Sequence, residues 1–271
     1  MTRFEGMSRL PFDRYLALLE TESRRFRDVL ADCDPAARVP GCPAWDAADL
    51  LWHLGEVQGF WAWVVAHRPA SPRDGYDEPA RPTSYADLLT LFDEHAAALV
   101  TALGEADPGE AAWSWAPEQT VGFTYRRQSL EALVHRVDAE QTAGVSSPLD
   151  PALATDGVEE VLDVMYGGCP DWGTFSPLPH LLRVDTTDTG ESVWVRLGRF
   201  SGTDPESGTS YDEDDISVVD DPDAEPDAVI SGTAQDLLLR LWRRGDGGDT
   251  RLAGNLEIVD RFRQVVHQPI N

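Results

Sequence analysis

The chain has 271 residues, of which 42% are hydrophobic, and its formal net charge is -26, from 48 acidic residues and 22 basic residues that are all arginine. This acidity argues against non-specific nucleic-acid binding and against attraction to an anionic membrane surface, because both depend on basic patches. The length favours two domains, and the hydrophobic content is sufficient for ordinary cores.

The cysteine content points to a reducing compartment. Cys33, Cys42 and Cys169 are odd in number and form no C-x-x-C motif, so a disulfide framework is not expected. The N-terminus has no apolar core of signal-peptide length, and no run approaches the roughly 18 apolar residues of a membrane-spanning helix. We therefore expect a soluble cytoplasmic protein, and we expect it to be a monomer because no coiled-coil seam is present.

The first half of the chain is predicted to be helical. Apolar residues recur at helical spacing, and Asp46 and Ser84 are the predicted N-caps of the second and third helices. Four amphipathic helices with one long crossover loop are typical of a four-helix bundle. The predicted helices cover residues 12–31, 46–67, 85–103 and 124–143.

The pattern changes after residues 144–155, which are predicted to be a linker. We expect two domains, residues 1–148 and residues 155–271, so that the fold class is a two-domain α+β protein. The predicted elements of the second domain are helices over 158–166, 233–242 and 255–266, strands over 181–184, 192–197, 216–219 and 228–230, and an exposed acidic loop over 203–215.

Two residues in the fourth helix could bind a metal ion. Glu131 and His135 are four residues apart, so both project from one face of the helix. A carboxylate and an imidazole in this arrangement can hold two corners of a tetrahedral Zn²⁺. His53, in the second helix, is the best candidate for the third ligand. Each of these residues also has an ordinary explanation as a packed or surface side chain.

Three segments carry a more specific pattern. They are Val39-Pro40-Gly41-Cys42-Pro43-Ala44-Trp45-Asp46 with Asp49-Leu50 and His53-Leu54-Gly55, then Arg127 through Gly144, and then Ile230 through Arg244. In combination they resemble the mycothiol-dependent maleylpyruvate isomerase family. The resemblance implies a DinB-like metal-binding four-helix bundle followed by a small C-terminal domain related to sterol-carrier-like α+β folds. One departure is Gly254-Asn255, where the family tends to have Gly-Asp, and this exchanges one N-cap for another.

The resemblance also implies a chemistry. On the family pattern His53, Glu131 and His135 are the metal ligands, and three protein ligands leave an open position, as in catalytic zinc sites. Mycothiol, a low-molecular-weight thiol of actinobacteria, would bind there through sulfur as a thiolate. The thiolate would add to an activated cis double bond, and rotation and elimination would give the trans isomer. The same thiolate acting on another electrophilic small molecule would make the protein an S-transferase.

Further residues are candidates for supporting roles. Asp138 lies one turn after His135 and could accept a hydrogen bond from a ligand imidazole. Glu56 has the same relation to His53. The alternative for both carboxylates is a solvated charge on a helix surface.

Arginines are the candidates for binding a substrate anion. Arg126 and Arg127 could bind a carboxylate bidentately or could be surface charges. The resemblance implies an arginine that reaches the active site from the C-terminal domain, and Arg244 or Arg243 matches that position. A basic residue in the last turn of a helix also complements the helix dipole, which is the alternative explanation.

Two other functions remain open. A metal-bound water in place of the thiol would give a thiol-independent hydrolase or lyase. A protein without metal would be a non-enzymatic module that binds a small molecule or a partner. Zn²⁺ is the expected metal, although two imidazoles and a carboxylate also suit Ni²⁺, Co²⁺ or Fe²⁺.

Overall fold

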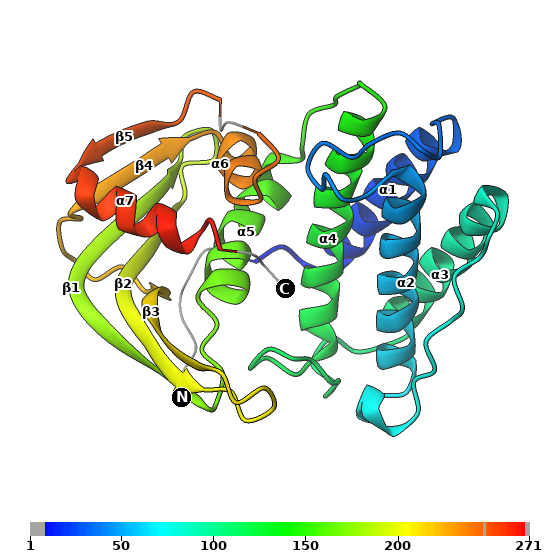
Figure 1. The fold of residues 1–271 in the computed structure, drawn as a ribbon, viewed down its shortest axis with the longest axis horizontal. Coiled ribbons are helices and arrows are strands. Elements are labelled where there is room, and N and C mark those ends of the chain that lie inside the picture. Colours follow the sequence, from blue (N-terminus) through cyan, green and yellow to red (C-terminus); the bar gives the residue numbers. More distant parts are fainter. Residues whose placement is uncertain (1–8, 246–247, 269–271) are drawn as a thin grey trace. The chain divides into compact units, whose positions relative to one another are not determined.

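The computed structural model describes residues 9–245 and 248–268, and it divides into two compact units (Figure 1). One unit is Leu10–Pro148, and the other comprises Leu149 onwards together with Arg9. The predicted spans 1–148 and 155–271 extend into residues 1–8, 246–247 and 269–271, which lie outside the described residues. The predicted α+β fold is confirmed, since four N-terminal helices are followed by an α/β unit with a five-stranded sheet.

The first unit is a bundle of four long helices. α1 packs mainly on α4, and α2 packs on α3 and also contacts α4 (Figure 1). Phe26 of α1 and Phe92 of α3 meet in the core, with ring centroids 5.1 Å apart. The helices are α1 (Phe12–Ala31), α2 (Ala47–Ala66), α3 (Tyr85–Gly104) and α4 (Val121–Thr142), with a short 3₁₀ helix η1 (Pro72–Asp74) after α2. Within the described part of the chain, no helix is both long and apolar enough to cross a membrane.

Side-chain caps determine where the helices of the site begin. Asp46 accepts a hydrogen bond from the Asp49 backbone N–H, and the Asp49 carboxylate accepts one from the Asp46 N–H, which completes a capping box at the start of α2. Thr120 accepts from the Phe123 N–H, so α4 begins at Val121 and not at residue 124 as the sequence predicted. The apolar pattern did not reveal this extra turn because its start depends on the threonine cap.

A close helix contact fixes α2 against α3. The His95 ring of α3 lies against Gly59 of α2, and its Nδ1 is 2.8 Å from the Gly55 carbonyl oxygen. A Cβ atom at Gly59 would lie only 2.3 Å from His95 Nδ1. Gly59 therefore permits the approach that holds in place the helix carrying His53.

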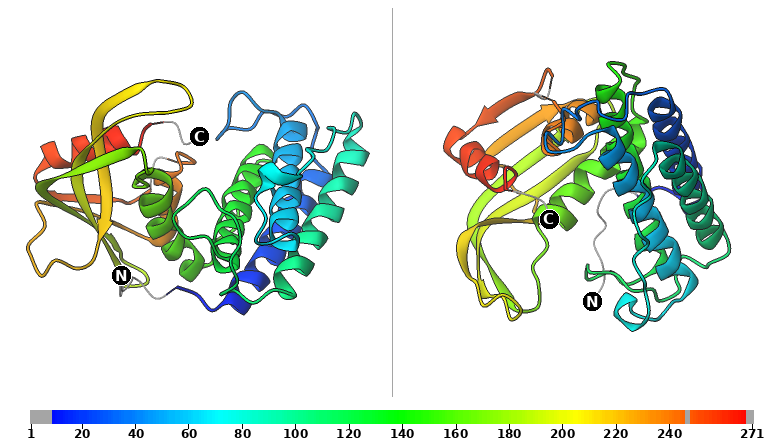
Figure 2. Two further views of the ribbon diagram at one scale, coloured as in Figure 1. Left: turned by 90° about the horizontal axis from the view of Figure 1, so that it is seen from below. Right: turned by 45° about the vertical axis from the view of Figure 1, so that its right-hand side comes forward.

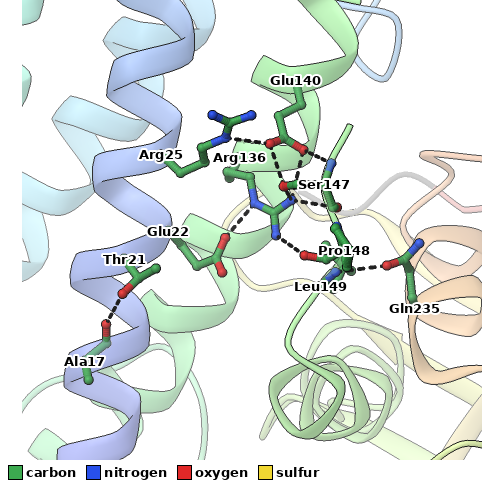
Figure 3. Close-up of polar contacts among 10 residues, drawn as sticks. All are labelled: Ala17, Thr21, Glu22, Arg25, Arg136, Glu140, Ser147, Pro148, Leu149 and Gln235. Carbon is green, nitrogen blue, oxygen red and sulfur yellow. Dashed lines mark hydrogen bonds and ion pairs between the residues drawn. The ribbon is translucent and has the colours of Figure 1, made fainter. Parts of the chain in front are cut away.

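Buried ion pairs attach residues 147–148 to the bundle (Figure 3). Arg136 donates from Nε to Glu22 at 2.6 Å and from Nη1 to Glu140 at 3.0 Å. Glu140 also accepts from Arg25 at 2.8 Å and from the Ser147 hydroxyl at 2.7 Å. We refer to these five residues as the anchor network. Because Arg136, Glu22 and Glu140 are almost completely buried, their ion pairs hold the chain after α4 in a defined position.

The second unit is built around one sheet with strand order β3-β2-β1-β4-β5. β1 pairs in parallel with β4, and the other pairs are antiparallel. Helix α7 contacts strands β1, β3 and β4, and Figure 2 shows it lying along the sheet. The strands are β1 (Gly173–Thr186), β2 (Ser192–Thr203), β3 (Ser210–Val219), β4 (Ala228–Gly232) and β5 (Arg251–Gly254), and the helices are α5 (Pro151–Glu160), a π-helix η2 (Val161–Tyr166), α6 (Ala234–Leu241) and α7 (Leu256–Val265).

Two predictions for this unit were wrong, and one strand was missed. A helix begins at Pro151, within the predicted linker, because Asp150 caps it and proline is well suited to a first helical turn. Residues 210–215 of the predicted acidic loop 203–215 belong to β3, where Arg199 of β2 pairs with Asp212 and Asp214 across the sheet. Strand β5 was missed because its four residues show no period-two alternation and acquire strand geometry by pairing with β4.

Candidate metal centre

Three side chains from two helices converge in the first unit. His53 lies in the second turn of α2, and Glu131 and His135 lie one turn apart near the middle of α4. Glu131 Oε1 is 3.1 Å from His135 Nε2 and 3.5 Å from His53 Nε2. One ligand atom from each residue lies within 4.8 Å of the other two. The three residues singled out by the sequence therefore surround one point.

These separations suit a metal ion. Two ligands on a tetrahedral ion with bonds of about 2.1 Å lie about 3.4 Å apart. The measured distances of 3.1 and 3.5 Å fall on either side of that value. Two imidazoles and one carboxylate are also the protein donor set of several catalytic zinc sites. The residues present thus fit a divalent metal and leave a coordination position for another molecule.

Asp138 contacts one of the histidines. Its Oδ2 is 2.9 Å from His135 Nδ1, and the aspartate is completely buried. When Nδ1–H donates to this carboxylate, the lone pair of a neutral imidazole is on Nε2, which faces Glu131. Asp138 thus orients His135 in the way that carboxylates orient metal-binding histidines in zinc proteins.

The electrostatics of the site are dominated by the opposed charges on α4. Burial lowers the pKa of His135, but the charge of Glu131 and hydrogen bonds with Asp138 and Glu131 outweigh it and raise that pKa to about 9. Burial raises the pKa of Glu131, but the charges of His135 and Arg127 outweigh it and hold that pKa well below its ordinary value. A divalent cation would replace the His135 proton, because metal ligands bind in their deprotonated forms.

The site is reachable from solvent beside an indole. About 32% of the His53 side chain is exposed, against 7% for His135. The half-buried Trp45 lies next to both rings, with centroids 4.7 Å from that of His53 and 6.2 Å from that of His135. Trp45 precedes the Asp46 cap, so the same turn that starts α2 places an aromatic wall beside the ligands.

Arg127 has a more specific contact than the sequence indicated. Its Nη2 donates to Glu131 Oε2 at 2.8 Å, and the arginine is 4% exposed. The spacing of four residues on one helix was the signal available in the sequence. Arg126 is also buried, and Glu56 is half-buried.

The candidate arginines of the second unit follow α6. Arg244 donates from Nη1 to the Trp242 carbonyl at 2.8 Å, and its guanidinium carbon lies 5.7 Å from the centroid of the Trp242 ring. Arg243 has a positive φ of 59° and donates to the His267 carbonyl. Arg243 thus contacts the segment that follows α7, and Arg244 contacts Trp242 at the end of α6.

Comparison with known proteins relates both units to one family. Residues 16–140 match the description "Mycothiol maleylpyruvate isomerase N-terminal domain", and residues 152–261 match "MDMPI C-terminal domain". The chain belongs to the mycothiol-dependent maleylpyruvate isomerase family. The predicted membership is therefore confirmed, and the two matches together span most of the chain.

Solved structures agree with this family at the level of the fold. The crystal structure of the mycothiol-dependent maleylpyruvate isomerase aligns with a TM-score of 0.55 and 14% identity, covering 90% of this chain and 93% of that one. A histidine-to-alanine variant of that isomerase aligns equally well, with the same coverage and identity. A comparison with curated proteins gives no significant match.

Proposed function

We propose that the protein is a divalent-metal enzyme that activates a low-molecular-weight thiol, mycothiol, for attack on an electrophilic small molecule. The observation that carries this proposal is the convergence of His53, Glu131 and His135 at separations suited to one ion. Membership of the maleylpyruvate isomerase family supports the thiol and the reaction class. The reaction is isomerisation of a maleylpyruvate-type cis double bond, or addition of the whole thiol, through its sulfur, to another electrophile whose ring opens or whose leaving group departs.

The side chains of the site have distinct tasks in this proposal. The metal, with Zn²⁺ as the expected ion, supplies the positive charge that lowers the pKa of a bound thiol so that it reacts as a thiolate. His53, Glu131 and His135 hold the ion, and Asp138 holds the His135 ring in the tautomer whose Nε2 can bind it. Trp45 restricts the path by which the thiol or the substrate reaches the proposed metal ligands. Arg244 is proposed to contact an anionic group of the substrate.

The test is turnover of maleylpyruvate by zinc-loaded protein with and without mycothiol, followed by a set of epoxides and alkyl halides. We expect turnover that requires both the metal and the thiol and that disappears in His53→Ala. Turnover that persists after complete removal of thiol would favour a metal hydrolase or lyase. A protein that binds no metal and is indifferent to chelators would be a non-enzymatic binding module.

The role of Arg244 has its own test. Arg244→Ala should raise KM for an anionic electrophile, while metal content and thiol binding stay at wild-type levels. Arg243→Ala is the matched control, because it removes an equal charge from the adjacent position. Equal kinetic effects of the two substitutions would argue against a specific substrate contact by Arg244.

A further inference from the structure

Glu131 presents its two carboxylate oxygens to different neighbours. Oε1 faces the imidazole nitrogens of His135 and His53 at 3.1 and 3.5 Å. Oε2 accepts a hydrogen bond from Arg127 Nη2 at 2.8 Å. One oxygen therefore lies among the proposed ligand atoms, and the other is engaged by a guanidinium one helical turn earlier on α4.

Arg127 is well placed to keep Glu131 Oε2 bonded to its guanidinium while Oε1 faces the histidines. Its side chain is 4% exposed, so the ion pair is shielded from water and a charge-assisted hydrogen bond is strong there. A basic residue four positions before an acidic one is the less favourable order for stabilising a helix. Arg136 and Glu140 have the same order, and what sets Arg127–Glu131 apart is that its carboxylate also faces two imidazoles.

We propose that Arg127 is a positioning residue that restricts Glu131 to binding the metal through Oε1 alone. The inference rests on the metal site of the proposed function. A carboxylate with both oxygens available can bind a metal in a bidentate manner. When Arg127 holds Oε2, the three residues supply three donor atoms and the ion keeps an open position. Arg127 thereby acts on the number of ligands and not on the substrate directly.

A cobalt-substituted protein reports this coordination through its visible spectrum, which depends on geometry. With Co²⁺ bound, the wild type should show the intense absorption of a four-coordinate ion. In Arg127→Met, Oε2 is released to the ion, and the intensity should fall towards the weak absorption of five- or six-coordinate cobalt. Arg127→Lys keeps a charged donor and should restore much of the wild-type intensity. Arg27→Met, which removes an arginine paired with Asp93 on the other side of the bundle, should leave the spectrum unchanged.

An unchanged cobalt spectrum in folded Arg127→Met would overturn the proposal. A second measurement does not depend on the folding of any variant. X-ray absorption of the zinc-loaded wild type should show a single carboxylate oxygen in the first shell, and a bidentate carboxylate would equally overturn the proposal. Failure of the wild type to take up either metal would instead refute the underlying metal site, so the two failures are distinguishable.

Discussion

Two arginine–glutamate pairs on α4 have the same spacing but different surroundings. Arg127–Glu131 and Arg136–Glu140 are both pairs at i and i+4, and both arginines are almost completely buried. In the anchor network every charged group is matched by another, since Arg136 and Arg25 face Glu22 and Glu140 (Figure 3). At the candidate metal centre, Glu131 bonds one oxygen to Arg127 and directs the other at two imidazoles.

The comparison shows how a structural ion pair differs from a candidate metal-binding site. Burial raises the pKa of Glu140, but hydrogen bonds and charge from Arg25, Ser147 and Arg136 outweigh it and lower that pKa. The carboxylate then serves to fix the chain, because Ser147 donates to it from both the hydroxyl and the backbone N–H. Glu131 differs because, in the proposed function, a metal ion would replace its direct contacts with the histidines.

The largest effect should come from breaking the anchor network. Arg136→Met removes the cation that bonds Glu22 and one of the two arginines that bond Glu140, and breaking buried pairs of this kind costs about 3–5 kcal/mol of unfolding free energy. Chemical denaturation followed by tryptophan fluorescence checks this loss. The protein that remains folded should still bind metal, because Arg136 does not contact the three proposed ligands in the described structure. If Arg136→Met kept the stability of the wild type but lost metal binding, the roles assigned to Arg136–Glu140 and Arg127–Glu131 would be wrong.

A smaller effect is expected at the metal centre. Asp138→Asn replaces the carboxylate that accepts from His135 Nδ1, and loss of such a partner weakens metal binding by about 10–100-fold. Competition with a coloured zinc chelator measures the dissociation constant. The matched control is Glu140→Gln, a carboxylate-to-amide change on the same helix, which should lower stability but not the metal affinity of the folded protein. Equal losses of affinity in both variants would show that Asp138 has no specific role.

The smallest effect concerns a buried carboxylate in a different setting. Asp215 of β3 accepts from the Ile216 N–H, and burial raises its pKa from 3.8 to about 6. Since the folded pKa is above the unfolded one, the folded state holds the proton more tightly, and stability falls as pH rises from about 4 to about 6. Asp215→Asn should therefore stabilise the protein by about 1–2 kcal/mol at pH 7 after allowance for solvent screening.

This stabilisation should disappear at low pH. Below about pH 4 the wild-type carboxyl is protonated in both states, so the two proteins should unfold at the same denaturant concentration. A constant difference between them at pH 4 and pH 7 would mean that the amide packs better and that ionisation is not the cause. Unfolding midpoints measured across this range separate the two explanations.

The sequence predicted most of the bundle because its signals are local. The limits of α1 and α3 follow from apolar spacing, and the sequence correctly predicts the cap residues Asp46 and Ser84. The second unit was harder, because β5 and the acidic part of β3 depend on pairing with distant strands. Hydrophobic alternation does not reveal a strand whose side chains are largely exposed and charged.

The candidate site shows the same division between local and distant information. Spacing placed Glu131 and His135 on one face of a helix, and His53 on another helix was the best candidate for a third ligand. The family resemblance implied the same three residues. The meeting of His53 with α4 depends on how the two helices are rotated and displaced against each other, which a single sequence does not specify. The engagement of Glu131 Oε2 by Arg127 could be proposed from spacing, but the choice between this carboxylate and a substrate anion required the structure.

Binding of one metal ion by His53, Glu131 and His135 can be tested by the metal content of the purified protein, measured by mass spectrometry beside His53→Ala and His135→Ala. We expect about one equivalent of divalent metal in the wild type and its loss in both variants, because each removes one of three protein ligands. A folded wild-type protein that contains no metal and takes up none on titration with Zn²⁺ would show that these residues do not form a metal site.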